Sequence, residues 1–470
     1  PELLKGRVKT LHPKIHSAIL ADRDNLDHIS DLKNIKIDTI DLVVCDLYPF
    51  SEVVKKKKEL NDCVENIDIG GITLLRGAAK NFRFVTVLAD ISYYEDFITH
   101  LKENDGCSTY NYRLKRAKEA FSYSSKYDFE ISNWFSNINK KVSKNLSLSN
   151  NEMKNDLSYG ENSHQKAYFY QDEDVKINWG NFRQIQGKQL SYNNHLDLDA
   201  SLNLLYNFKN YSDSLVGIIK HTNPCGVASG KNILEAFKNA FACDPLSAFG
   251  GIVVINKKVS QDIALEIVDK FFEMIIAPDF DKKSLKIFSR KKNLRIIYLG
   301  TKWMLNKINK KEVRSVLHGT LVQEKDTKSI SEKDLKVVTK ISPNKKQILD
   351  LIFAWNVVKL VKSNGIVIVK DMVTLGIGSG QPSRVDSSKI AINKASEVKN
   401  STKKTTQYLK NAVMASDAFF PFADGIDEAI TKGVKSIIQP GGSINDHQVI
   451  DLANKRKISM VFTGIRSFKH

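Results

Sequence analysis

The sequence predicts an α/β protein, because short β-branched apolar runs alternate along the chain with segments of helical spacing. Two stretches carry this prediction. A Gly-Gly turn within residues 66–81 runs into the helical segment LLRGAAK, which completes a strand–turn–helix unit. Residues 348–358 place apolar side chains at helical spacing and are followed by a strand at 365–369. Such units are the local ingredient of a parallel sheet.

Length and composition limit the class of protein. At 470 residues with 42% hydrophobic content, the chain can form several domains with cores of their own. No apolar run is long enough for a bilayer-spanning helix, so no membrane contact is expected. The five cysteines include no Cys-x-x-Cys pair, which favours reduced thiols in a cytoplasmic protein over disulfides or a structural zinc site.

The net charge of +18 comes mainly from lysine in short scattered runs such as residues 55–58. No helix-turn-helix, zinc-finger or aromatic-interleaved basic repeat accompanies it, so no nucleic-acid partner is expected. We interpret the charge as a solvated surface with a compositional bias. Basic side chains also suit phosphorylated or carboxylated small molecules.

The elements of the N-terminal part follow in order. Residues 41–47 and 84–88 are predicted as buried strands, and residues 93–102 as a helix. Residues 137–156 are rich in Asn, Ser and Lys and are predicted as a linker. The chain is therefore divided into a domain at 1–136, the linker at 137–156 and a domain at 157–470.

The α/β alternation resumes after the linker. It allows two weakly similar lobes, split near residues 325–342. The predicted helices lie at 233–242, 260–274 and 446–455, and the predicted strands at 251–255, 434–438 and 458–462.

The strongest candidate for an active site is the stretch 215–228. Its strand-like apolar run ends at Lys220 and His221, and a turn containing Pro and Gly is predicted at residues 223–226. In α/β proteins, chemistry gathers where strands end and loops begin. A buried strand with an ordinary basic cap is equally compatible with this segment taken alone.

Two motif classes are disfavoured by their spacing. Residues 375–384 contain G-x-G-x-G and end in Arg384, so a dinucleotide-binding fold is poorly supported, while a tight turn and a close approach to an anionic ligand both stay open. Residues 223–228 contain half of the P-C-x-x-C zinc signature of nucleoside deaminases, but Ala228 stands at the second cysteine. None of the ten histidines is followed by x-Glu, so no catalytic metal is expected.

Seven further segments combine aromatic, amide, histidine and cationic side chains. Stacking residues and amides suit a flat heterocycle, and Arg or Lys suits a phosphate or carboxylate. Taken singly, each segment is more often structural than functional. They are residues 6–13 (GRVKTLHP), 46–50 (DLYPF), 157–165 (LSYGENSHQ), 190–197 (LSYNNHLD), 244–251 (DPLSAFGG), 416–424 (SDAFFPFAD) and 466–470 (RSFKH).

Together with KHTNPCG and IDIGGITLLRGAAKN, these segments occur in the order of one family along the whole chain. The chain resembles the bifunctional purine-biosynthesis family that joins an AICAR transformylase to an IMP cyclohydrolase. The resemblance implies formyl transfer from the co-substrate 10-formyltetrahydrofolate to AICAR, which gives FAICAR, and then dehydrative ring closure to IMP. It also implies a methylglyoxal-synthase-like parallel-sheet domain, two deaminase-like α/β lobes without zinc, and a homodimer with the transformylase site at the subunit interface.

The resemblance gives roles to three residues of the transformylase. Lys220 and His221 match its catalytic pair. A neutral His221 would take the proton of the attacking AICAR amine, and Lys220 would stabilise the oxyanion or protonate the departing folate nitrogen. Asn364 matches the asparagine that positions the formyl oxygen.

The remaining site residues are also implied by the resemblance. In the cyclohydrolase, Tyr48, Asp68 and Lys80 match groups that assist ring closure by proton transfer and electrostatics, and Lys9 is a further catalytic candidate that contacts the substrate. Substrate or folate contacts are implied for Arg7, Thr10, Tyr159, Gly160, His164, Asn193, Arg384, Phe419, Asp424 and Arg466, with Arg466 on the AICAR phosphate.

Three departures from the family pattern bear on activity. The chain starts at Pro1, where a strand and a phosphate loop normally precede it, so about fifty to sixty residues are expected to be missing and ring closure is in question. Ser158 replaces an arginine associated with the AICAR phosphate, which costs about 1.5–3 kcal/mol of binding unless a lysine such as Lys166 substitutes. Asp46 stands where the family usually has asparagine.

Three alternatives accompany this interpretation. One is a degenerate family member that retains only one of the two activities. The others are a zinc-dependent deaminase-like hydrolase, which stoichiometric zinc would support, and a nucleic-acid-binding module, which steeply salt-dependent binding would support.

Overall fold

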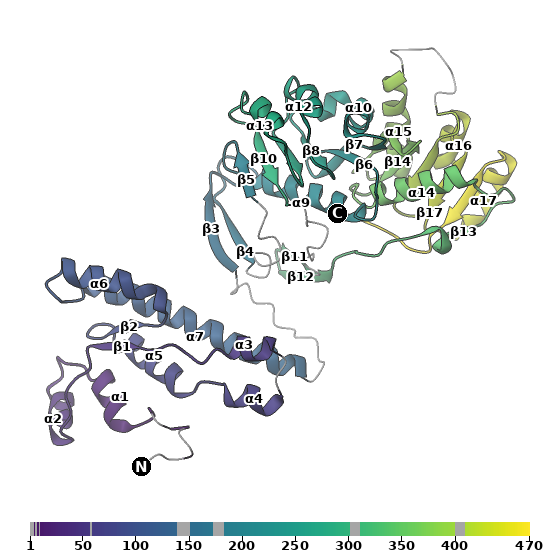
Figure 1. Cartoon of the computed structure of the whole chain (residues 1–470). Coiled ribbons are helices and arrows are strands. Elements are labelled where there is room, and N and C mark those ends of the chain that lie inside the picture. Colours follow the sequence, from purple (N-terminus) through teal and green to yellow (C-terminus); the bar gives the residue numbers. More distant parts are fainter. Residues whose placement is uncertain are drawn as a thin grey trace. The chain divides into compact units, whose positions relative to one another are not determined.

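Two groups of strands, separated in the sequence, give the chain two units, Pro1–Asn151 and Glu152–His470. The computed structural model describes residues 4, 7–8, 10–56, 59–138, 151–172, 183–300, 311–399 and 409–470. Both units combine strands with helices, which confirms the predicted α/β class (Figure 1). Among the described residues, no helix has both the length and the apolar character that crossing a membrane requires.

Unit 1 is built on two parallel strands, β1 (Leu42–Val44) and β2 (Thr86–Leu88). Parallel strands need a crossover, and here it contains α5 (Gly70–Lys80), which buries Leu75 and Ala78 in the core. The long helix α7 (Tyr110–Ile138) packs on α5 and β2. The other helices are α1 (Pro13–Leu20), α2 (Leu26–Asn34), α3 (Phe50–Lys55), α4 (Leu60–Glu65), the 3-10 turn η2 (Ile91–Tyr93) and α6 (Tyr94–Glu103).

Unit 2 contains one twelve-stranded sheet in the order β13-β18-β17-β16-β14-β15-β7-β6-β8-β9-β10-β5. This order is palindromic about the β15/β7 seam. On each side, a hairpin is followed by three parallel strands and an antiparallel edge strand, so the unit consists of two lobes of the same topology. The strands are β5 (Arg183–Gln186), β6 (Ser214–Lys220), β7 (Asn223–Gly230), β8 (Ile252–Ile255), β9 (Met274–Ala277), β10 (Arg295–Tyr298), β13 (Lys336–Val337), β14 (Ile366–Lys370), β15 (Val373–Gly378), β16 (Val413–Ser416), β17 (Ser436–Gln439) and β18 (Ser459–Phe462).

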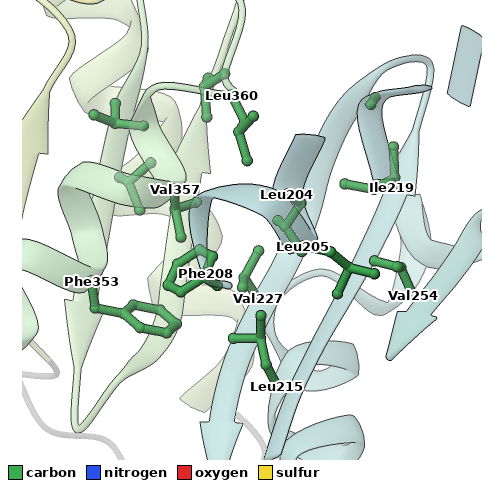
Figure 2. Packing of buried hydrophobic residues seen from close by; sticks show 14 of the residues in the cluster. Leu204, Leu205, Phe208, Leu215, Ile219, Val227, Val254, Phe353, Val357 and Leu360 are labelled. Carbon is green, nitrogen blue, oxygen red and sulfur yellow. The ribbon is translucent and has the colours of Figure 1, made fainter. Parts of the chain in front are cut away.

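The central strands are apolar on both faces because helices cover both. Leu215 and Ile219 of β6 face the helices α9 and α14, whereas Val216 and Ile218 face α10. Figure 2 shows side chains of α9 and α14 meeting over the sheet. The helices are α9 (Tyr192–Asn207) and α14 (Lys345–Val358) on that face, and α10 (Ile233–Cys243), α12 (Gln261–Val268), α13 (Lys282–Phe288), α15 (Arg384–Lys399), α16 (Asp424–Thr431) and α17 (Asp446–Lys455) on the other.

Two small hairpins and two short helices complete unit 2. The strand β3 (Asn151–Leu157) begins within the predicted linker 137–156, and α7 extends to Ile138 at its other end. The hairpin β11–β12 occupies the sequence between the two lobes. The remaining elements are β4 (Ala167–Asp172), α11 (Pro245–Ala248), β11 (Lys311–Val316), β12 (Gly319–Glu324) and the 3-10 turn η5 (Glu332–Asp334).

The helix predicted over residues 260–274 is wrong in its last third. The helix α12 ends at Val268, and Met274 begins β9, which pairs in parallel with β8 and β10. The apolar run of β9 is buried on both faces, so it shows no alternation that separates it from a buried helix.

Candidate functional site

The turn predicted at residues 223–226 lies elsewhere. The strands β6 and β7 pair up to Lys220 and Asn223, which leaves His221 and Thr222 as a two-residue hairpin turn. Both turn residues have positive φ, +50° and +63°, the backbone that a type I′ hairpin requires. The Pro and Gly that suggested a turn lie inside β7. His221 is therefore the first residue of the tip.

A set of hydrogen bonds fixes the backbone of this tip. The Thr222 amide donates to Asp197 Oδ1 of α9 at 2.6 Å. The Thr222 hydroxyl and Asn223 Nδ2 donate to the His221 carbonyl at 2.7 and 3.1 Å. Asn223 Oδ1 in turn accepts from the Lys362 amide at 2.9 Å, which ties the tip to the loop before β14. The His221 backbone is held while its side chain is exposed.

Lys220 and His221 lie at a cavity of about 510 Å³. Lys220 Nζ donates to the Phe249 carbonyl at 2.6 Å. Asp244 and Lys394 form an ion pair of 2.9 Å in the cavity wall. Burial raises the pKa of Asp244, but hydrogen bonds from Ser247 and Lys394 outweigh it and hold the pKa below its ordinary value. The wall therefore combines two lysines, a histidine and an ionised carboxylate.

The two cysteines of this cavity are poor nucleophiles. Burial is the main cause that raises the pKa of Cys225 to about 12, and it does the same for the fully buried Cys243. The thiolate is the reactive form, so neither side chain is suited to covalent catalysis. Among the residues that the structure describes, no three His, Cys, Asp or Glu side chains converge in a way that would hold a metal ion.

Asn364 and Arg384 belong to a buried polar cluster around Asp417. Arg384 Nη1 donates to Asp417 Oδ1 at 2.5 Å, and Nη2 donates to Asn364 Oδ1 at 2.6 Å. Arg384 is only 8% exposed and Asp417 is fully buried. Asn364 Nδ2 donates to the carbonyls of Gln381 and Pro382, both at 2.9 Å. The guanidinium of Arg384 is therefore paired inside the protein. Asn364 is connected to the cavity by its hydrogen bond to Gln381, which is one of the residues that line it.

Two of the implied substrate contacts belong to segments that join this cluster. Phe419 lies two positions after Asp417 and is 39% exposed. The Ser467 amide donates to the Asp417 carbonyl at 2.9 Å, which holds the C-terminal segment there. The guanidinium of Arg466 lies 4.6 Å from the ring centre of Phe468. These aromatic and cationic side chains are exposed.

The other implied contacts lie apart from the cavity lining. Asn193 Nδ2 donates to the Glu161 carbonyl at 3.2 Å, which ties the loop containing Tyr159, Gly160 and His164 to the start of α9. Asp424 is exposed at the first turn of α16. The contacts that do not line the 510 Å³ cavity are Tyr159, Gly160, His164, Asn193, Arg384, Phe419, Asp424 and Arg466.

In unit 1, three of the implied cyclohydrolase residues meet at the start of α5. Asp68 Oδ1 accepts from the Gly71 amide at 2.6 Å, and Oδ2 accepts from the Tyr48 amide at 3.3 Å. The Thr10 hydroxyl fills the space that a side chain at Gly70 would take. A carboxylate at a helix N-terminus is stabilised by the unpaired amides and the helix dipole.

Lys80 lies away from this point. Lys80 is the last residue of α5, about 15 Å along the helix from its first turn, and lines a separate cavity of about 690 Å³. Arg7 forms an ion pair with Glu65. Lys9 lies outside the described residues.

Four polar residues at or near the 510 Å³ cavity are not assigned by the sequence. Asp197, Asp244 and Asp417 each lie in one of the seven segments identified in the sequence. The sequence therefore indicates these segments but not the individual aspartates. Lys394 carries no sequence signal, because it is one of many lysines on a polar helix. Its position becomes visible only through its ion pair with Asp244.

Comparisons with known proteins cover the whole chain. A family model described as "AICARFT/IMPCHase bienzyme" matches residues 78–394, and one described as "MGS-like domain" matches residues 1–73. The "Bifunctional purine biosynthesis protein PurH" of Caldicellulosiruptor saccharolyticus is 47% identical over 477 residues, which span 100% of this chain and 89% of the relative. The proteins of the same name from Rhodospirillum rubrum and Ruegeria pomeroyi are 46% and 44% identical, with the same coverage.

Proposed function

Because the chain belongs to the AICARFT/IMPCHase bienzyme family of bifunctional purine-biosynthesis proteins, we propose that its two reactions are divided between its two units. The chain is an AICAR formyltransferase and IMP cyclohydrolase. Unit 2 would perform formyl transfer, since Lys220 and His221 belong to it. Unit 1, which the MGS-like model matches in part, would perform ring closure. Family membership sets aside the deaminase-like and nucleic-acid-binding alternatives.

The proposed formyl transfer is a proton-coupled acyl exchange. The AICAR amine attacks the formyl carbon of 10-formyltetrahydrofolate, and His221 accepts the proton that the amine loses. Lys220 stabilises the oxyanion that forms. The bond between the formyl carbon and the folate nitrogen then breaks, and the proton on His221 goes to that nitrogen, which yields FAICAR and tetrahydrofolate.

One observation carries this proposal: a rigid hairpin tip presents the exposed His221 at a cavity whose wall contains Lys220. The resemblance assigns Asn364 to the formyl oxygen, and its side chain donates to the carbonyl of Gln381, which lines this cavity. The further contacts with AICAR or folate follow from the family resemblance. They are Tyr159, Gly160, His164, Asn193, Arg384, Phe419, Asp424 and Arg466.

For ring closure we propose the residues around the start of α5. Asp68 is held by two amides, so it is oriented for proton transfer, and the Tyr48 amide is one of them. Thr10 lies against Gly70 and would contact the substrate. Lys80, Lys9 and Arg7 complete the proposed set from the resemblance.

The assembly and the location are also proposals. A homodimer with the transformylase site at the subunit interface is expected from the family. The proposed partners are AICAR, FAICAR and reduced folate, with no catalytic metal. Five free cysteines agree with a cytoplasmic location.

The test is His221→Ala in the full chain, with formyl transfer measured from AICAR and 10-formyltetrahydrofolate. Removing a general base lowers kcat by about 10²–10⁴-fold. His318→Ala is the matched control, because His318 also lies in a two-residue hairpin turn, between β11 and β12, and is exposed. The control is expected to keep the wild-type rate. A His221→Ala enzyme with the full rate would show that His221 is not the base.

A further inference from the structure

The tip that carries His221 has a counterpart in the other lobe. The hairpin β14–β15 also closes with a two-residue turn, Asp371–Met372, between the paired Lys370 and Val373. Both of its turn residues have φ of +55°. The palindromic order of the sheet relates the two hairpins, because β6 and β7 correspond to β14 and β15.

An aspartate holds each turn from the same side of the sheet; Asp350 is buried and Asp197 is half-buried. Asp350 of α14 accepts from the Asp371 amide at 3.0 Å and from the Met372 amide at 2.7 Å. Asp197 of α9 accepts from the Thr222 amide at 2.6 Å. Burial is the leading influence on both carboxyls and raises the pKa of each. The helices even share the local sequence, Leu-Asp-Leu, at residues 196–198 and 349–351.

The conformation of these turns explains why a carboxylate is needed. Left-handed backbone is unfavourable for any residue with a Cβ, and two such residues in succession persist only where the surroundings hold them. His221 and Thr222 are not glycines, so neither residue adopts positive φ without a steric cost. Burying a carboxylate is itself unfavourable unless its oxygens accept hydrogen bonds, which the turn amides supply.

We propose that Asp197 is a positioning residue for formyl transfer: by holding the Thr222 amide, it fixes the direction in which His221 points toward the cavity. This inference rests on the proposed role of His221. Asp350 performs the same structural task at a turn that lines no part of the cavity, because neither Asp371 nor Met372 is among its lining residues. The two aspartates therefore share one structural role, and only Asp197 has a catalytic consequence.

The experiment compares Asp197→Asn with Asp350→Asn in the full chain. Each substitution keeps the size of the side chain but removes its negative charge and one of its two oxygen acceptors, which weakens its hydrogen bonds to the turn amides. Both are expected to lower the Tm of unit 2. Only Asp197→Asn is expected to lower kcat, by about 10²-fold, the effect of misplacing a catalytic group by about 1 Å. The KM values for AICAR and 10-formyltetrahydrofolate should stay within about twofold, because substrate binding is retained.

The outcomes separate a positioning role from a purely structural one. Wild-type kcat in Asp197→Asn, or an equal loss in Asp350→Asn, overturns the inference. If Asp197→Asn does not fold, Asp197→Glu and Asp350→Glu replace the pair, with the same expectation for kcat. If His221→Ala keeps the full rate, the proposed role of His221 and this inference fall together. If His221→Ala loses the rate while Asp197→Asn keeps it, only the inference falls.

Discussion

Cys225 lies in β7, three residues after the turn residue Thr222, and lines the same cavity as Lys220. Burial raises the pKa of its thiol to about 12, so the thiol stays protonated at neutral pH and ionises only as the pH approaches that value. At pH 8, nearly all Cys225 thiols are therefore protonated. We therefore predict that iodoacetamide at pH 8 labels the exposed Cys107 first and leaves Cys225 and Cys243 unlabelled, as measured by mass spectrometry.

The control for this labelling is the protein in urea, where all cysteines should react. Raising the pH toward 10 should increase labelling of Cys225 in proportion to the thiolate, provided that the fold is retained. Rapid labelling of Cys225 at pH 8 would contradict the burial seen in the structure.

At the residue scale, the sequence can identify a candidate site residue from its neighbours along the chain, but not from its tertiary contacts. Lys220 and His221 could be found because they end an apolar run, and the structure puts them at a cavity. The environment of Arg384 could not be found, because its partner Asp417 lies 33 positions away. An exposed anion-binding arginine and a buried, paired one have the same sequence, and only tertiary contacts tell them apart.

At the element scale, glycines in the two hairpins make room for helices. A side chain on Gly226 would overlap the Ala240 carbonyl oxygen of α10, and one on Gly376 would overlap the Ala391 carbonyl oxygen of α15. Backbone cannot move aside as a flexible side chain does. We predict that Gly226→Ala and Gly376→Ala each destabilise unit 2 by about 1–3 kcal/mol or more, measured by urea unfolding.

Gly319→Ala is the control for both variants, because no atom lies within 4 Å of the Cβ that it would add. Its effect should stay within about 1 kcal/mol, the size of an intrinsic glycine-to-alanine difference. A Gly226→Ala protein as stable as the wild type would mean that α10 does not approach β7 as closely as described.

Gly226 also explains why the sequence predicts the turn at residues 223–226 and not at His221 and Thr222. Pro and Gly usually mark turns, and Pro224 and Gly226 lie within five positions of His221. In the structure, Gly226 is a strand residue whose missing side chain lets α10 pack closely against β7. The turn itself is formed by His221 and Thr222. Asp197, which accepts a hydrogen bond from the Thr222 amide of this turn, lies 25 positions away on α9. Local composition therefore cannot locate this turn.

At the scale of the whole molecule, the α/β class could be predicted because it depends on local alternation. The order of the strands could not, since periodicity does not say which strands pair. The structure gives the order of the strands, which is symmetric about β15 and β7. This symmetry shows that the hairpin carrying His221 has a counterpart in the other lobe. The sequences of the two lobes are too weakly similar to reveal that they share one topology, which only the structure shows.

The division into two units predicts that the two reactions can be separated. All residues proposed for formyl transfer belong to unit 2, which has its own core around α9, α14 and the twelve-stranded sheet. A fragment of residues 151–470, which keeps β3 complete, should therefore fold and transfer the formyl group with a kcat within about twofold of the full chain. The same fragment should not close the ring of FAICAR, because Tyr48 and Asp68 lie in unit 1. Assaying each half-reaction separately, with circular dichroism to verify folding, tests the division. A folded fragment that lost formyl transfer would show that unit 1 contributes to the transformylase, and a fragment that closed the ring would place the cyclohydrolase in unit 2.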